Sequence, residues 1–215
     1  MDIFWMGHSC FRIKGKEAVL FTDPFDPGRG IALDKTSAQI VTVSHPHPGH
    51  SNAAGVVGGP RVVKGPGEYE VAGVLITGIS TFHDDEQGAK RGKSTVYVIE
   101  MEGLRLCHLG DLGHGLSNQQ MGEIGDVEVL MVPVGGGNTI DAAAAAQIVR
   151  TLEPRIVLPM HYRTDLLSQG LEPVDVFLQE MGVKAEPEPR LSVSKTNLPG
   201  EIRVALLSTP SIKNK

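Results

Sequence analysis

Short apolar runs separated by turn-forming residues dominate this chain, and their pattern predicts mostly strands. Glycine and proline interrupt the runs, and Glu102-Gly103 between two of them is a typical hairpin signal. The expected strands occupy residues 2–6, 10–13, 18–22, 39–43, 61–64, 69–71, 74–79, 94–101, 104–109, 127–134, 155–159, 191–194 and 201–207. This many strands indicates that sheets form the main layers of the fold.

Two segments in the second half follow a helical pattern instead. Residues 140–152, with Thr139 as the expected N-cap, and residues 173–181 are expected to form helices. Each half of the chain ends in alternating strands and helices, which suggests two sheets with helices outside them. No segment has the composition of a linker, so we expect a single domain over residues 1–215.

The composition is that of a globular protein and disfavours several classes of partner. Of the 215 residues, 40% are hydrophobic and 21% are charged. The net charge of −5, without a long basic run, gives nucleic acid no strong electrostatic footprint. Cys10 and Cys107 form no disulfide framework, and no apolar segment is long enough to span a bilayer. Because the first residues also lack a signal-peptide pattern, we expect a cytoplasmic protein without membrane or nucleic-acid partners.

Histidines gather where the expected strands end. The motif SHPHPGH at residues 44–50 follows one strand directly, and His83, His108 and His161 each lie at the end of another. Asp111 follows Gly110, three residues after His108. A single histidine of this kind is usually a hydrogen-bonded loop residue. Several imidazoles at the ends of separate strands can converge on one edge of a sandwich, where they suit zinc and similar ions.

The order and spacing of seven sequence blocks resemble the metallo-β-lactamase superfamily, in its branch of ascorbate-6-phosphate-lactonase-like metal-dependent hydrolases. The blocks are WMGHSCF at 5–11, FTDPF at 21–25, SHPHPGH at 44–50, TFHD at 81–84, CHLGD at 107–111, VPVGG at 132–136 and LPMHY at 158–162. The resemblance runs nearly end to end. It implies an α+β fold, a four-layer αββα sandwich with a metal site on one edge.

The resemblance also assigns roles to individual residues. For the first metal it implies the ligands His45, His47 and His83. For the second metal it implies His50 and His161, with Asp111 bridging both ions. Asp23 is expected to orient a ligand histidine from behind, while His8 and His114 are expected around the ligands. The expected catalytic residues are Asp111, His50 and His108.

Position 49 departs from the family's pattern. The signature His-x-His-x-Asp-His carries an aspartate where this chain has Gly49, so the second metal loses one carboxylate. We therefore expect one tightly bound ion at His45, His47 and His83 and a weakened second site. Zn²⁺ is the expected cofactor, as one or two ions, with Mn²⁺ or Fe²⁺ as alternatives.

The function implied by the resemblance is hydrolysis of a small ester, lactone or phosphoester by a metal-bound hydroxide. One alternative, favoured by Gly49, is a degenerate member that binds metal or ligand with little turnover. A second alternative is a nucleic-acid phosphodiesterase, which the acidic charge disfavours. The expected partner is a small-molecule substrate of unidentified structure, and a homo-oligomer is compatible with the resemblance.

Overall fold

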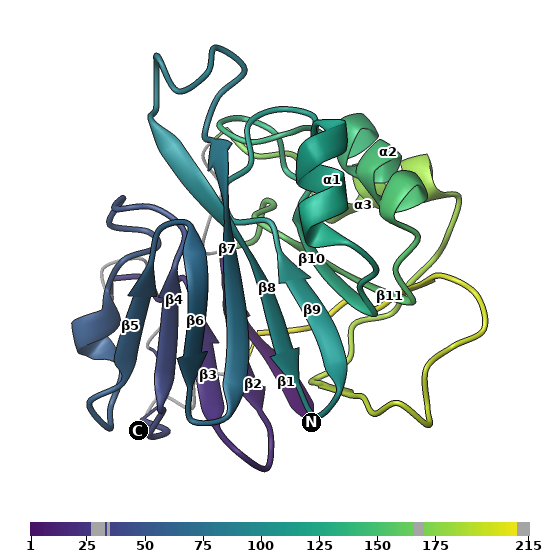
Figure 1. Ribbon diagram of the computed structural model, residues 1–215. Coiled ribbons are helices and arrows are strands. Elements are labelled where there is room, and N and C mark those ends of the chain that lie inside the picture. The colour runs from purple at the N-terminus through teal and green to yellow at the C-terminus, as the bar shows by residue number, and fades with distance from the viewer. Residues whose placement is uncertain (27–32, 34, 166–169, 210–215) are drawn as a thin grey trace.

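Two mixed sheets packed face to face form the body of the protein (Figure 1). This computed structural model describes residues 1–26, 33, 35–165 and 170–209. The first sheet has six strands in the order β12-β1-β2-β3-β4-β5. Their bounds are β1 Asp2–Gly7, β2 Cys10–Lys14, β3 Val19–Thr22, β4 Ile40–Val43, β5 Arg61–Lys64 and β12 Leu191–Ser192. Strands β3, β4 and β5 run parallel, whereas β1, β2 and β3 alternate in direction.

The second sheet has seven strands in the order β13-β11-β10-β9-β8-β7-β6. Their bounds are β6 Gly67–Val71, β7 Val74–Phe82, β8 Lys93–Met101, β9 Leu104–His108, β10 Val129–Pro133, β11 Ile156–Met160 and β13 Arg203–Val204. An antiparallel meander, β6 to β9, leads into the parallel strands β9, β10, β11 and β13. The fully apolar β10 is buried along its whole length, as expected for a strand covered on both faces.

Three α-helices follow the antiparallel meander in sequence and lie beside β10 and β11 (Figure 1). They are α1 Asn118–Ile124, α2 Ala142–Leu152 and α3 Val174–Met181. Helix α2 buries Ala145, Ala146 and Val149 and packs on β10 and α3. On the outer face of the six-stranded sheet, the described covering consists of Phe25, Ala38 and Val56 from loops, next to the 3-10 turn η2 Ala53–Gly55.

The predicted α+β sandwich is confirmed, with two local corrections. Asp141 caps α2, because its carboxylate accepts a hydrogen bond from Ala144 N at 2.8 Å. The expected cap Thr139 instead donates to Gly136 O within the preceding turn. Helix α1 was not expected, since only Ile124 is buried on it. The helix starts with a capping box between Ser117 and Gln120, and the few apolar residues of the segment do not indicate a helix.

Among the described residues, no helix has the length and apolar character needed to cross a membrane.

A buried tyrosine joins the two sheets next to the histidine motif. Tyr97 of β8 donates from its hydroxyl to Val43 O at 2.9 Å and accepts from Gly65 N at 3.0 Å. Two residues before Tyr97, Thr95 N donates to the O atom of Ser44, the residue after Val43, at 2.9 Å. These bonds fix the end of β4, and with it the start of the motif, against the seven-stranded sheet.

We predict that Tyr97→Phe lowers the free energy of unfolding by about 1–3 kcal/mol, because the buried partners of the hydroxyl lose a hydrogen bond. Denaturant unfolding monitored by circular dichroism measures this change. The matched control is Tyr162→Phe, which removes a hydroxyl from a ring stacked on Trp5 without touching the β4–β8 link. Equal stability of Tyr97→Phe and the wild type would contradict the structural role of the bridge.

Candidate metal centre

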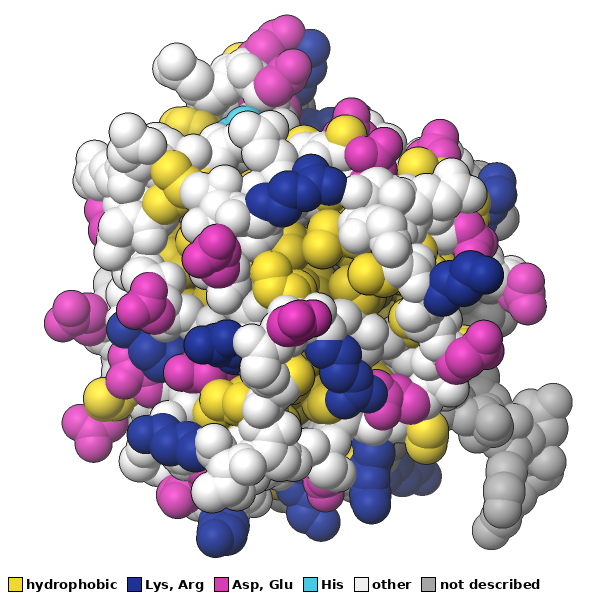
Figure 2. Space-filling model, turned by 90° about the vertical axis from the view of Figure 1, so that its right-hand side faces the viewer, with side chains coloured by type: hydrophobic (Ala, Val, Ile, Leu, Met, Phe, Trp, Pro, Cys, Tyr) yellow, Lys and Arg dark blue, Asp and Glu magenta, His cyan; other side chains and the backbone are white. Residues whose placement is uncertain are grey.

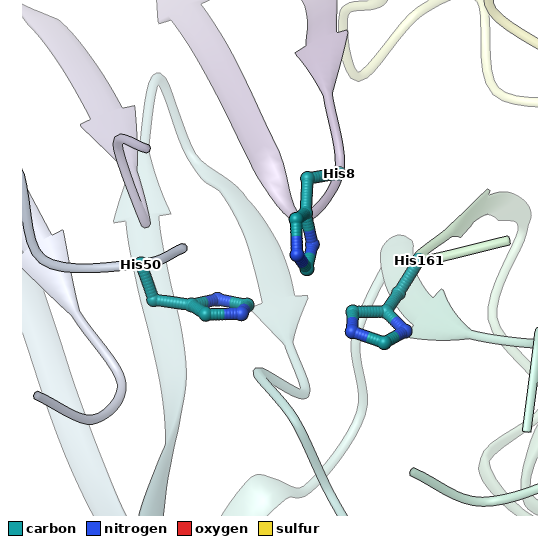
Figure 3. Close-up of side chains that lie close together, drawn as sticks. All are labelled: His8, His50 and His161. Atoms are coloured by element: carbon teal, nitrogen blue, oxygen red, sulfur yellow. The ribbon is translucent and has the colours of Figure 1, made fainter. Parts of the chain in front are cut away.

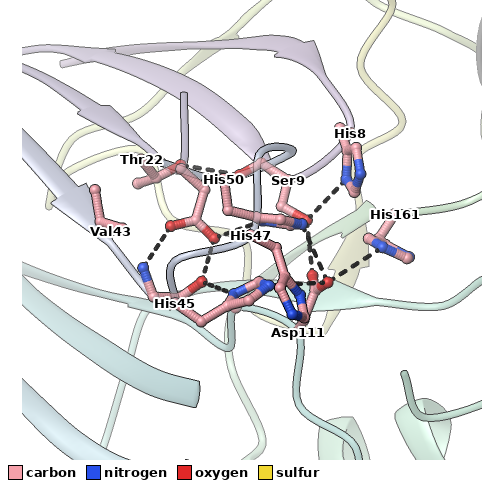
Figure 4. Close-up of polar contacts among 12 residues, drawn as sticks. His8, Ser9, Thr22, Val43, His45, His47, His50, Asp111 and His161 are labelled. Atoms are coloured by element: carbon pink, nitrogen blue, oxygen red, sulfur yellow. Dashed lines mark hydrogen bonds and ion pairs between the residues drawn. The ribbon is translucent and has the colours of Figure 1, made fainter. Parts of the chain in front are cut away.

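The ends of six segments meet at one edge of the sandwich (Figure 4). From the first sheet come the turn after β1, the end of β3 and the motif after β4, which carry His8, Asp23 and residues 44–50. The second sheet contributes the residues that follow β7, β9 and β11, namely His83, Asp111 and His161. The strands of each sheet that deliver these residues point in the same direction, so their carboxyl ends lie together.

A buried carboxylate lies at the centre of the site. Oδ2 of Asp111 is 3.1 Å from His50 Nε2 and 3.4 Å from both His83 Nε2 and His161 Nε2. It lies 3.8 Å from His45 Nε2. Burial alone would raise the pKa of Asp111, but the charges of His161 and His50 and their hydrogen bonds lower that pKa well below its usual value. The site therefore contains a fixed negative charge surrounded by imidazoles.

The histidines form two groups of three around this carboxylate. One group is His45, His47 and His83, and the other is His8, His50 and His161. Within each group, one nitrogen from each ring lies within 4.8 Å of the others. Figure 3 shows His8 between His50 and His161. Asp111 Oδ2 contacts members of both groups, so it is placed to be shared between them.

Asp23 holds two of these histidines from behind. Its Oδ2 is 3.0 Å from His50 Nδ1, which leaves His50 Nε2 facing Asp111. Ser44 donates to Asp23 through its backbone N–H at 2.7 Å and through its hydroxyl at 2.5 Å. Since that hydroxyl proton goes to Asp23, His45 Nδ1, 2.9 Å from Ser44 Oγ, must be the donor in their contact. The lone pair of His45 is then on Nε2, directed at the site.

The two buried carboxylates, Asp111 and Asp23, affect the pKa values of the histidines beside them. Burial lowers the pKa of His50, but Asp111 and Asp23 on its two sides raise it overall to about 10. Burial and the positive charge of His50 lower the pKa of His45 to about 3. In the metal-free protein, His50 therefore holds a proton between the two carboxylates, while the lowered pKa of His45 favours its neutral form. A site that retains a proton here also attracts a metal cation, which competes for the same nitrogen.

The side chains fit a metal ion. Within the described part of the chain, His45 Nε2, His83 Nδ1 and His161 Nδ1 are buried and have no hydrogen-bond partner. Buried polar atoms are rarely left without partners, and coordination to a cation would satisfy such nitrogens. A donor set of imidazoles with one carboxylate suits zinc and other first-row divalent metals.

The backbone adopts unusual conformations at several of these positions. The φ angles of His8, Asp23 and His161 are 55°, 38° and 52°, in the left-handed region that non-glycine residues rarely adopt. Gly110, just before Asp111, also has a positive φ of 56°, and a Cβ there would lie 2.7 Å from the Ser44 side chain. Strain of this kind is concentrated at functional sites, where the surrounding structure enforces it.

Two of the expected site histidines have other contacts. His108 is buried, with Nε2 2.8 Å from Ser9 O and Nδ1 accepting from Gly110 N at 3.2 Å. Because the backbone occupies both nitrogens, this geometry suits a structural role, and the catalytic role expected of His108 stays a prediction. His114 accepts from Phe82 N at 3.1 Å, which places it behind the strand that leads to His83 rather than among the ligands.

Sequence reasoning missed two serines that the structure places in the site. Ser44 links Asp23 to His45, and Ser9 donates to Asp111 Oδ1 at 3.4 Å. Both are direct neighbours of site histidines in the sequence, at the ends of strands. Their place next to these histidines was the only sequence feature that could have identified them, because serine is common in such turns.

Comparison with known proteins agrees with this geometry. A family model for the β-lactamase superfamily domain matches residues 2–161. A UPF0173 metal-dependent hydrolase of Thermoplasma volcanium is 30% identical over 190 residues, which cover 76% of this chain and 84% of the relative.

Solved structures give the same result. The crystal structure of a candidate zinc-dependent hydrolase of the metallo-β-lactamase superfamily from Thermotoga maritima has a TM-score of 0.80 and 39% identity, covering 96% of this chain and 99% of that one. A metallo hydrolase of Ignicoccus hospitalis, at 19% identity and a TM-score of 0.64 over 98% of this chain and 96% of that one, shares the fold. The chain therefore belongs to the metallo-β-lactamase superfamily, within the UPF0173 family.

Proposed function

We propose that the protein is a metal-dependent hydrolase that acts on a small ester, lactone or phosphoester. The observation that carries the proposal is the buried Asp111 carboxylate between two groups of three histidines. The names of the Thermoplasma and Thermotoga relatives, a metal-dependent and a candidate zinc-dependent hydrolase, support it. Zn²⁺ is the proposed ion, with Mn²⁺ or Fe²⁺ as alternatives that the same donors accept.

A bound divalent ion would supply a nucleophile from water at neutral pH and would polarise the bond that is cleaved. The chain's own residues prepare the site for this chemistry. Asp23 and Ser44 hold His50 and His45 with one nitrogen of each ring turned toward Asp111. Preorganised ligands of this kind need little rearrangement during a reaction.

The first histidine group gives the substrate a route to the ion. His45 and His83 are buried, but the neighbouring His47 is exposed. An ion held by these three side chains would therefore lie at the surface end of the site, within reach of a small molecule. The ascorbate-6-phosphate-lactonase-like branch is our proposal for the finer placement, on the basis of the seven sequence blocks that resemble it. The cytoplasmic location and the homo-oligomer stay predictions.

The degenerate binder is the second candidate, and Gly49 favours it. This glycine is buried beside His50 and offers no ligand atom. No comparable observation favours a nucleic-acid phosphodiesterase. On the face seen in Figure 2, acidic and basic side chains are interspersed around apolar patches instead of forming a basic surface.

We predict that chelation removes hydrolysis of at least one substrate in a panel of generic esters, lactones and phosphodiesters. The loss should be on the order of 100-fold or more, because the ion contributes several kcal/mol to the barrier. Activity should return on addition of Zn²⁺, Mn²⁺ or Fe²⁺. Metal binding without turnover on any substrate would favour the degenerate binder, and salt-sensitive cleavage of RNA or DNA would favour the phosphodiesterase.

We further predict that Asp111→Asn and Asp23→Asn weaken metal binding to different degrees. Asp111→Asn should sharply reduce the metal retained, since it removes the central charge. Asp23→Asn should lower the affinity about 10–100-fold, the usual effect of removing a residue that orients a ligand. Competition with a chromophoric chelator measures both effects, and Asp85→Asn, at an exposed aspartate, is the control. Wild-type affinity in both variants would refute the site.

A further inference from the structure

The second histidine group is as tightly clustered as the first. Ring centroids of His8 lie 4.5 Å from those of both His50 and His161. In the first group, the corresponding distances are 4.6 Å for His45–His47 and 4.7 Å for His45–His83. His50 and His161 follow His8 by 42 and 153 positions, so the fold rather than local sequence brings the three together.

The backbone fixes His8 against His161. His8 O accepts hydrogen bonds from Trp5 Nε1 at 2.9 Å and from His161 N at 3.1 Å. Both histidines have left-handed φ angles, 55° for His8 and 52° for His161. Two strained residues joined through their backbones hold their rings in a fixed relation, as ligands of one ion require.

His50 is the third member of the second group, and each of its ring nitrogens faces a carboxylate. It meets Asp23 through Nδ1 and Asp111 through Nε2. Its neighbour in the chain, Gly49, contributes no side chain, and the imidazole of His8 packs edge-on against His50 at an interplanar angle of 80°. His8 thus brings a nitrogen donor to the side of the site that lacks a carboxylate at position 49.

We propose that His8, His50 and His161 hold a second divalent ion, with Asp111 shared between this ion and the one at His45, His47 and His83. In this arrangement His8 replaces the ligand that Gly49 cannot provide. The inference rests on the proposed metal-dependent function, and it replaces the expectation of a weakened second site. With the shared Asp111, these three imidazoles would supply four donors, the coordination number usual for zinc.

The experiment compares zinc stoichiometry in the wild type, His8→Asn and His161→Asn. Asparagine suits both positions because it tolerates the left-handed conformation better than most residues. Zinc is measured by elemental analysis after dialysis and by calorimetric titration, and circular dichroism of the metal-free proteins checks the fold. We expect two ions in the wild type, and in both variants one ion with the second bound at least tenfold more weakly. His114→Asn, at a histidine outside both groups, is the matched control and should keep two.

Gly49→Asp tests whether His8 stands in for the missing carboxylate. Added to His8→Asn, it should restore the second ion, because the new carboxylate lies next to His50 in the chain. Failure of this double variant to recover the ion would overturn the replacement of position 49 by His8.

If His8→Asn does not fold, a measurement on the wild-type protein tests the same inference. The cobalt-loaded protein should show paramagnetically shifted signals from six imidazoles, whereas five would exclude His8 as a ligand. Two ions retained at wild-type affinity in His8→Asn, or a wild type that binds only one ion, would also overturn the inference. A wild type that binds no metal would instead refute the proposed function itself.

Discussion

The buried charge of Asp111 is the constraint on which this edge of the protein depends. A carboxylate removed from water is costly unless cations or hydrogen-bond donors surround it. Here the surrounding groups are four imidazoles from three separate segments, each with a nitrogen within 3.8 Å of Oδ2. His50 is protonated between Asp111 and Asp23, and a divalent cation among the rings would compensate the charge of Asp111 more fully. Under the proposed function, the fold assembles a negative centre that a metal ion would complete.

Asp23 shows how the fold holds these ligands in place. It directly follows β3, whose parallel neighbour β4 ends at the histidine motif. Through its two oxygens it holds Ser44 and His50, and through Ser44 it sets the tautomer of His45. Parallel pairing of two adjacent strands thus positions a buried aspartate behind two ligands. The cost of the strained Asp23 backbone, with φ of 38°, is offset by this set of short hydrogen bonds.

Sequence patterns predicted the features that depend on residues close together in the chain. Strands with buried faces were found because apolar periodicity records burial, and the strand-end histidines followed from that assignment. Helix α1 and the Asp141 cap escaped because their stability depends on side-chain hydrogen bonds at the helix start rather than on apolar spacing. The contact of His8 with His50 and His161 depends on how two sheets pack. No periodicity within one strand records that, so His8 was expected only at the margin of the site.

The exchange of a carboxylate for an imidazole changes the charge of the site under the proposed arrangement. Two divalent ions would bring four positive charges, against the two buried carboxylates Asp111 and Asp23. An aspartate at position 49 would neutralise one more charge, which neutral His8 cannot do. The loaded site therefore keeps a larger positive charge, and this charge lies in a buried, weakly screened environment. Such a field would attract anionic groups more strongly than the same site with an aspartate at position 49. Among small esters, lactones and phosphoesters, the proposed arrangement accordingly favours those that carry a phosphate or carboxylate near the cleaved bond.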